Sequence, residues 1–186
     1  MTIPAPRQRK NREHRERVGL LMVHTGDGKG KSTAAFGMAM RAAGHGMRVV
    51  IVQFIKGSRD CGELHALRRF PEITLHRAGE GFTWEVRDDD RQAALARWGM
   101  ERAAEALAAG VDLLILDEVH IVLDKGFYDT DALLALLAAR PDGVHVCCTG
   151  RRAPQALVDA ADLVTEMRLI KHPWQQKIRA QRGIEF

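Results

Sequence analysis

The sequence predicts an α/β fold: a mainly parallel sheet of about six strands with helices on both faces. Three observations predict it. Apolar runs alternate with helical patterns along most of the 186 residues. Several of these runs are continuously apolar, as expected of strands in a parallel sheet that is covered on both faces. A glycine-rich segment, residues 25–33, separates the first apolar run from an alanine-rich helical stretch.

The elements are expected in a regular order along the chain. The first strand, Gly19–Val23, leads into the glycine-rich segment, and Thr33–Ala43 forms an alanine-rich helix that Gly44 closes. Asp88–Leu107 is the clearest helix, because its apolar residues recur at helical spacing. Right-handed crossovers between successive strands then give a parallel sheet. The remaining strands are predicted at Arg48–Ile55, Thr74–His76, Val111–Leu116, Val144–Cys148 and Leu163–Leu169, and the shorter helices at Asp131–Ala139 and Pro154–Ala161.

Residues 1–17 differ from the rest of the chain in charge. The chain has 28 basic and 24 acidic side chains, of which six basic and two acidic ones lie in this segment. The segment therefore has a net charge of +4, and residues 18–186 are neutral. We therefore expect one α/β domain over 18–186 and a basic N-terminal arm that is partly disordered or covers the active site. A short basic arm is more often solvated than bound to a phosphate polymer, so no nucleic-acid partner is expected.

Composition also bounds the location of the protein. No apolar run approaches the length of a membrane span, and residues 1–17 lack the apolar stretch of a secretory signal, so a cytoplasmic location without a membrane partner is expected. Cys61, Cys147 and Cys148 show no metal-ligand spacing. The adjacent pair is expected to point to opposite faces of a buried strand in a reducing compartment.

The segment Thr25-Gly26-Asp27-Gly28-Lys29-Gly30-Lys31-Ser32-Thr33 predicts a phosphate-binding loop. Such a loop turns backbone N–H groups inward, while its lysine adds charge and its serine hydroxyl can ligate a phosphate-bound Mg²⁺. A helix that starts at Ser32 would aim the positive end of its dipole at the same phosphates. The motif G-x-x-x-x-G-K-[ST] requires glycine where this chain has Thr25, and the alternative is a flexible surface turn. The order strand, loop, helix favours nucleotide binding in a P-loop NTPase-like (RecA-like) fold.

An acidic pair, Asp117–Glu118, follows the apolar run that ends at Leu116. Nucleotide-binding folds place a carboxylate at this point to hold Mg²⁺ or its water shell, although such a pair can instead cap a helix. With His120 it also matches the D-E-x-H motif of helicase-type motors, which need two such domains. The chain's only asparagine is Asn11, so the Asn-Lys-x-Asp guanine-reading motif is absent and adenine is favoured.

A set of short segments occurs in order over nearly the whole chain from residue 20. They are Thr25–Gly37 (TGDGKGKSTAAFG), Ala43–Gly46 (AGHG), Val52–Gly57 (VQFIKG), Gly81–Glu85 (GFTWE), Leu116–Glu118 (LDE), Ala139–Pro141 (ARP), Thr149–Arg151 (TGR), Lys171–His172 (KH) and Ala180–Phe186 (AQRGIEF). In this ordered set the chain resembles the P-loop ATP:corrinoid adenosyltransferases of vitamin B12 metabolism. The loop of that family also begins with threonine, which accounts for Thr25.

The resemblance implies transfer of the 5′-deoxyadenosyl group of ATP to the Co(I) centre of a corrinoid, with release of intact triphosphate. It also implies that the nucleotide lies in the reverse direction along the loop, so that the ribose C5′ is presented to cobalt. Co(I) is so strong a nucleophile that no protein general base is required. A homodimer, and a reduced flavoprotein as the electron donor, are the further implications.

Each matched residue takes a role from the resemblance. Gly26–Gly30 would give backbone donors to the triphosphate, with Thr25, Asp27, Lys29 and Thr33 completing the loop. Lys31 would neutralise the charge that builds on the leaving group. Ser32 and Glu118 would hold Mg²⁺, with Asp117 behind them. Arg151 would contact the ribose or a phosphate, or else is a solvated surface arginine.

Phe82 and Trp84 stand in a glycine-rich segment where packing in a core is a less natural explanation. The resemblance implies that they pack against the lower face of the corrin and displace its axial base, which makes reduction to Co(I) easier. Two other functions fit the phosphate loop alone. One is a phosphotransferase or ATPase that cleaves the γ-phosphate, and the other is a nucleotide-dependent interaction module. The pattern does not distinguish cobalamin from an earlier corrinoid, or biosynthesis from salvage.

Overall fold

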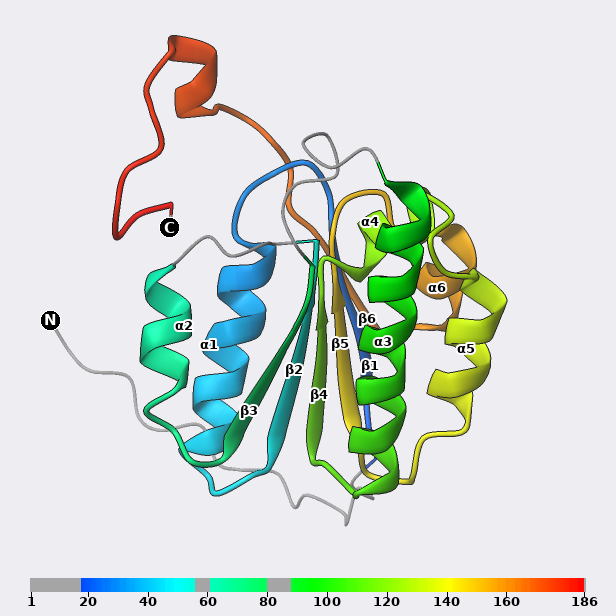
Figure 1. The fold of residues 1–186 in the computed structure, drawn as a ribbon. Coiled ribbons are helices and arrows are strands. Elements are labelled where there is room, and N and C mark those ends of the chain that lie inside the picture. Colours follow the sequence, from blue (N-terminus) through cyan, green and yellow to red (C-terminus); the bar gives the residue numbers. More distant parts are fainter. Residues whose placement is uncertain (1–17, 56–60, 80–87, 186) are drawn as a thin grey trace, which may run out of the picture.

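The computed structural model describes residues 18–55, 61–79 and 88–185, and it shows a parallel sheet between two layers of helices (Figure 1). The strands lie side by side in the order β3-β2-β4-β5-β1-β6, and each neighbouring pair is parallel. The predicted fold class is therefore confirmed. The strand bounds are β1 (Leu21–Thr25), β2 (Val49–Phe54), β3 (Ile73–Ala78), β4 (Leu113–Asp117), β5 (His145–Thr149) and β6 (Leu163–Glu166).

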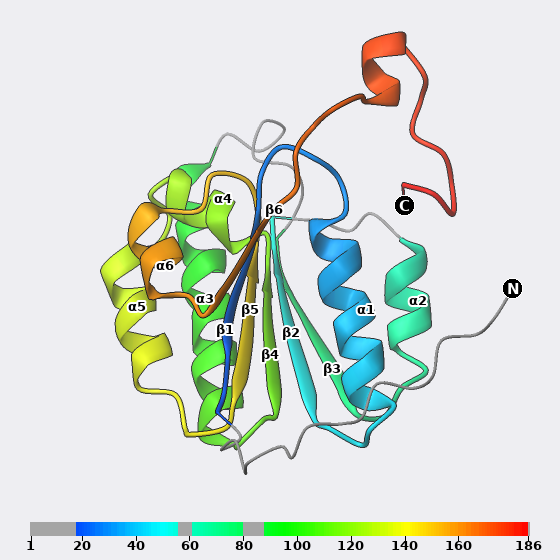
Figure 2. The ribbon, with the colours of Figure 1, turned by 180° about the vertical axis from the view of Figure 1, so that it is seen from behind.

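The helices divide between the two faces of the sheet (Figures 1 and 2). One face is covered by α1 (Lys31–Ala43) and α2 (Gly62–Leu67). The other is covered by α3 (Asp89–Ala108), α4 (Val119–Asp124), α5 (Thr130–Ala138) and α6 (Gln155–Ala160). A 3₁₀ helix, η1 (Pro173–Gln176), lies in a segment that leaves β6 and stands away from the sheet.

The sequence expectations match most of these elements within a few residues. Each predicted strand and each of the four predicted helices is present. The short helices α2 and α4 were not predicted. The last strand ends at Glu166 rather than Leu169, because the chain leaves the sheet there to run along the glycine-rich loop.

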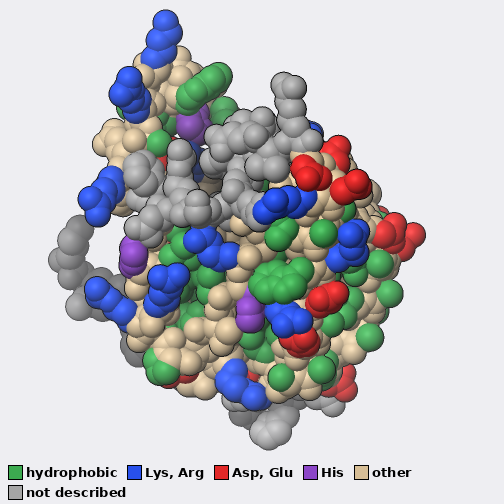
Figure 3. Space-filling view, in the orientation of Figure 1, with side chains coloured by type: hydrophobic (Ala, Val, Ile, Leu, Met, Phe, Trp, Pro, Cys, Tyr) green, Lys and Arg blue, Asp and Glu red, His purple; other side chains and the backbone are tan. Residues whose placement is uncertain are grey.

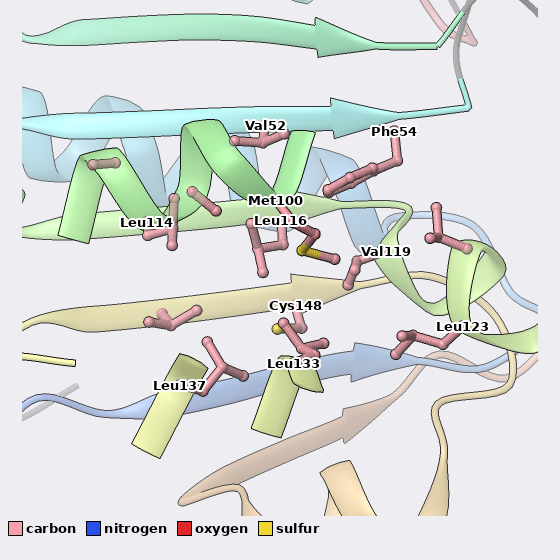
Figure 4. Packing of buried hydrophobic residues seen from close by; sticks show 14 of the residues in the cluster. Val52, Phe54, Met100, Leu114, Leu116, Val119, Leu123, Leu133, Leu137 and Cys148 are labelled. Carbon is pink, nitrogen blue, oxygen red and sulfur yellow. The ribbon is translucent and has the colours of Figure 1, made fainter. Parts of the chain in front are cut away.

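Alternate strand residues pack into a separate core on each face of the sheet. On the α3–α6 face, Leu114 and Leu116 of β4 meet Met100 of α3 and Leu133 of α5 (Figure 4). The smaller core lies under α1 and includes Phe36 and Ile115. Each apolar side chain buried in this way stabilises the fold by roughly 1.5–3 kcal/mol.

The two adjacent cysteines of β5 point to opposite faces, as predicted. Cys147 belongs to the core under α1, and Cys148 to the core under α3–α6. Burial raises the pKa of the Cys147 thiol to about 12 and raises that of Cys148 as well, so both thiols are protonated and inert at neutral pH.

The parallel arrangement gathers the strand ends at one edge of the sheet. The loops that follow β1, β4 and β5 all leave from this edge, which is uppermost in Figure 1. In open parallel sheets, ligands bind at this edge. Within the described ranges, none of the helices has both the length and the apolar character to span a membrane.

Candidate active site

The glycine-rich loop joins β1 to α1 at the carboxyl edge of the sheet. Gly26 and Gly30 have φ angles of 96° and 109°, in the left-handed region that a side chain disfavours. Gly30 ends the loop, and α1 begins with Lys31. The predicted order of strand, loop and helix is thus present, and the helix starts at Lys31, one residue before Ser32 and two before the predicted run Thr33–Ala43.

Lys31 points back into the loop rather than out to solvent. Its side chain is buried, and its Nζ donates hydrogen bonds to the carbonyl oxygens of Gly26 at 2.7 Å and Gly28 at 2.5 Å. Burial lowers the pKa of this ammonium group, and the carboxylate of Glu118 opposes the shift. Ser32 follows it half-buried, and Thr33 is exposed on the first turn of α1. A positive charge therefore lies inside the loop, with the start of a helix behind it.

The chain that follows β6 closes the other side of the loop. The Met167 N–H donates to Thr25 O at 2.8 Å, and the Gly28 N–H donates to Met167 O at 2.7 Å. A Cβ atom at Gly26 or Gly28 would lie 2.4 or 2.6 Å from the Met167 carbonyl oxygen, so both positions require glycine. The Gly28 N–H, expected to turn toward a phosphate, is therefore engaged within the protein.

We call residues 167–185 the C-terminal segment. Glu185, near its end, forms an ion pair with Lys29 of the loop. The segment carries five basic residues and one acidic residue, whereas residues 18–166 carry 17 basic and 21 acidic residues. Figure 3 shows several of its Lys and Arg side chains projecting at the upper left. A basic segment thus adjoins the loop on a domain whose remaining charge is negative.

A buried polar network joins three strand ends beside the loop. Asp117, at the end of β4, is fully buried, and its two carboxylate oxygens accept hydrogen bonds from Gln53 of β2 at 3.0 Å and Thr149 of β5 at 2.8 Å. The Thr149 hydroxyl in turn accepts the Glu118 N–H at 3.0 Å. Asp117 therefore orients the strand ends around Glu118.

Glu118 has a strained backbone, with φ 62° and ψ 21° in the left-handed region. It directly precedes α4, yet its side chain makes no capping hydrogen bond to that helix. This argues against the alternative in which the acidic pair merely caps a helix. The carboxylate is close enough to Lys31 to affect its pKa, so Glu118 and Lys31 belong to one electrostatic site.

Arg151 lies in the turn after β5 and faces the loop. Its Nε is 3.9 Å from Asp27 Oδ1, and both side chains are largely exposed. The two residues line a hollow of about 430 Å³ together with Glu166, Arg168, Leu169 and Ile170. The sequence left Arg151 as either a nucleotide contact or a solvated surface residue. In the structure its side chain is largely exposed, and it lies at the mouth of the loop.

The structure brings most of the predicted site residues together at one edge. These are Thr25, Gly26, Asp27, Gly28, Lys29, Gly30, Lys31, Ser32, Thr33, Asp117, Glu118 and Arg151. Phe82 and Trp84, and the basic arm at 1–17, lie outside the described residues.

Sequence reasoning missed several residues that support this site. Gln53, Thr149 and Glu185 fall in the short segments that carried the family resemblance, but no role could be assigned to them before the strand order was known. His120 was noted only as part of the D-E-x-H match. Met167 carried no signal at all, because it acts through its backbone.

Comparisons with known proteins agree with this geometry. Residues 17–186 match the model of the family described as "ATP:corrinoid adenosyltransferase BtuR/CobO/CobP". A corrinoid adenosyltransferase of Pseudomonas aeruginosa is 50% identical over 174 residues, which cover 92% of this chain and 86% of the relative. A corrinoid adenosyltransferase of Sinorhizobium is 44% identical, and the alignment covers 90% of this chain and 80% of the relative. The corrinoid adenosyltransferase CobA of Salmonella typhimurium is 38% identical, and the alignment covers 92% of this chain and 87% of the relative.

Proposed function

The chain belongs to the ATP:corrinoid adenosyltransferase family, and we propose that its glycine-rich loop holds the triphosphate of ATP while the adenosyl group passes to a corrinoid. It is thus an adenosyltransferase of cobalamin biosynthesis, not a phosphotransferase. The observation that carries the proposal for the loop is the buried Lys31 ammonium group, which lies among the loop carbonyls at the start of α1.

The reaction is a nucleophilic substitution at the ribose C5′. Co(I) supplies an electron pair and forms the cobalt–carbon bond, while the bond between C5′ and the ester oxygen breaks. The electron pair of this broken bond leaves with the triphosphate, and cobalt, whose own pair now forms the bond to carbon, becomes formally Co(III). Because the nucleophile is the metal of the substrate, the protein has no proton to remove. Its tasks are to align cobalt with C5′ and to stabilise the leaving triphosphate.

The loop residues fit the second task. Negative charge grows on the leaving triphosphate as the bond breaks, and Lys31 neutralises part of this charge. Its lowered pKa reflects partial removal of the ammonium group from water. In such a partly buried site a charge interacts more strongly with a bound anion than it does in water. Its two hydrogen bonds to loop carbonyls are exchanged for bonds to phosphate oxygens.

Mg²⁺ would be held by Ser32 and Glu118, with Asp117 in the outer sphere. Both Asp117 oxygens already accept hydrogen bonds from Gln53 and Thr149, which suits orientation of water rather than direct ligation. Within the described residues, no group of three His, Cys, Asp or Glu side chains could hold an ion alone. That fits Mg²⁺, which is bound by one or two protein oxygens together with phosphates and water. The ion would neutralise part of the triphosphate charge.

Five further parts of the proposal rest on the resemblance and on composition. Phe82 and Trp84 contact the lower corrin face and displace its axial base. The protein acts as a homodimer, receives electrons from a reduced flavoprotein, and works in the cytoplasm. Thr25, Asp27, Lys29 and Thr33 line the nucleotide, with Arg151 at its ribose or phosphates.

The phosphate product tests the proposal. The protein is incubated with ATP, Mg²⁺ and a chemically reduced corrinoid, and intact triphosphate is expected in a one-to-one ratio with the adenosylated corrinoid. Lys31→Met should lower kcat about 100-fold or more, as does the loss of a single transition-state donor. Lys125→Met, an exposed lysine that follows α4, is the matched control and should leave the rate unchanged.

Formation of ADP and inorganic phosphate would contradict the proposal and indicate a phosphotransferase or ATPase. Absence of any turnover, with ATP still bound, would indicate an interaction module. Equal rates for the two lysine variants would remove Lys31 from the mechanism.

A further inference from the structure

We propose that Thr25 is a positioning residue: its hydroxyl holds the turn after β5 so that Arg151 faces the nucleotide. The inference rests on the proposed function, because it assumes that Arg151 contacts ATP. It concerns the residue at which the loop departs from the usual phosphate-loop motif, where glycine would have no side chain.

Thr25 connects the glycine-rich loop to the turn through its side chain. Its Oγ1 accepts a hydrogen bond from the Ala153 N–H at 3.1 Å. Its backbone carbonyl accepts the Met167 N–H at 2.8 Å, which fixes the residue in the sheet. The hydroxyl is therefore a fixed acceptor that ties the far end of the turn to the end of β1.

The near end of the turn is held in two other ways. The Gly150 N–H donates to His24 O at 3.2 Å, and the ring of His120 bonds to Gly150 O at 3.0 Å through Nδ1. A carbonyl oxygen only accepts, so Nδ1 is the donor. Gly150 has a φ angle of 142°, and a Cβ there would lie 2.8 Å from His120 Cβ. The turn therefore has a fixed start, and Thr25 supplies the fixed end.

Two arginines occupy the turn between these fixed ends, and they point to different partners. Arg151 faces Asp27 of the loop, lines the hollow beside it, and lies near enough to affect the pKa of Lys31. Arg152 instead donates to Asp124 Oδ2 at 2.9 Å, at the end of α4. A turn that loses its Ala153 bond can rotate, and the two arginines then no longer have distinct directions.

The experiment is a double-mutant cycle on ATP binding and turnover, with pre-reduced corrinoid. Thr25→Val keeps the shape but removes the acceptor, and we expect the KM for ATP to rise about fivefold with a smaller change in kcat. Thr25→Ser keeps the hydroxyl and should restore the wild-type KM. Arg151→Ala should raise the KM about twentyfold, as expected for lost charge-assisted hydrogen bonds. Arg152→Ala is the matched control and should leave the KM unchanged.

The decisive variant combines Thr25→Val with Arg151→Ala. If Thr25 acts through Arg151, the double variant has the KM of Arg151→Ala alone. Multiplied effects, or an effect of Thr25→Val seen only in thermal unfolding, would overturn the inference. If Arg151→Ala leaves the KM unchanged, the proposed contact of Arg151 with ATP fails instead. Should the valine variant not fold, Thr25→Ala takes its place in the cycle.

Discussion

His120, in the first turn of α4, is a titratable residue buried beside the polar network at the strand ends. Its side chain is fully buried next to the loop, and its Nε2 makes no hydrogen bond within the described structure. Burial lowers its pKa to about 4, and the positive charge of Lys31 acts in the same direction. The imidazole is therefore neutral at physiological pH, which keeps a second positive charge away from Lys31.

This predicts a specific dependence of stability on pH. The unfolded chain takes up a proton at His120 below pH 6.5, whereas the folded protein does so only near pH 4. The folded state is therefore destabilised as the pH falls through this window, by about 3 kcal/mol in total from this residue.

The test compares the wild type with His120→Asn, whose amide can still donate to Gly150 O but does not titrate. The free energy of unfolding, measured in urea at pH 4 to 7, should fall less steeply for the variant. Parallel curves for the two proteins would show that His120 does not titrate in this range.

At the scale of elements, the close approach of α3 to the sheet depends on a glycine. Gly99 is buried in the middle of α3, where a Cβ would lie 2.5 Å from Phe54 Cε1 and 2.7 Å from Ala78 Cβ. Glycine weakens a helix, yet it allows α3 to lie directly on β2 and β3. Gly99 therefore sets how closely α3 packs on the carboxyl ends of these two strands.

Gly99→Ala should therefore lower the free energy of unfolding by about 1–2 kcal/mol, because the strain of overpacking exceeds the gain in helix propensity. Gly37→Ala is the matched control in α1, where an added Cβ meets nothing within 4 Å. It should raise the free energy of unfolding by about 0.5–1 kcal/mol. Urea unfolding of the two variants measures both values, and stabilisation by Gly99→Ala would contradict the packing argument.

The strands could be predicted from the sequence, but helix α4 and the contacts between strand ends could not. The strands were recognisable because continuous apolar runs occur where both faces are covered. The helix α4 was not, because Val119–Asp124 continues the apolar run of β4 and its start is a left-handed turn at Glu118 without glycine. Likewise, the contacts of Asp117 with Gln53 and Thr149 depend on β4 lying between β2 and β5. No local pattern contains that strand order.

At the scale of the whole molecule, the C-terminal segment returns to the first loop of the domain. Glu185 forms its ion pair with Lys29, so a carboxylate occupies a lysine that would otherwise face the triphosphate. Under the proposed function, in which Lys29 lines the nucleotide, bound triphosphate and Glu185 would compete for the same ammonium group. The competition would weaken binding of the released triphosphate, which carries more negative charge than ATP.

Glu185→Gln should consequently lower the inhibition constant for triphosphate about threefold, within the range of a partly exposed ion pair. Product inhibition of the adenosylation reaction measures it. In a Lys29→Gln background the same change should have no effect. An inhibition constant that Glu185→Gln leaves unchanged, or raises, would exclude competition for Lys29.

The pairing of β1 with β6 affects the order in which parts of the protein fold during synthesis. The first strand of the domain pairs with residues 163–167, which are synthesised almost a whole domain later. Contacts between segments so far apart in sequence form late and slowly, since a long loop must close first. A chain still emerging from the ribosome therefore lacks the Met167 carbonyl that shapes the loop around Gly28. The loop can take the shape seen here only after β6 has been synthesised and has paired with β1.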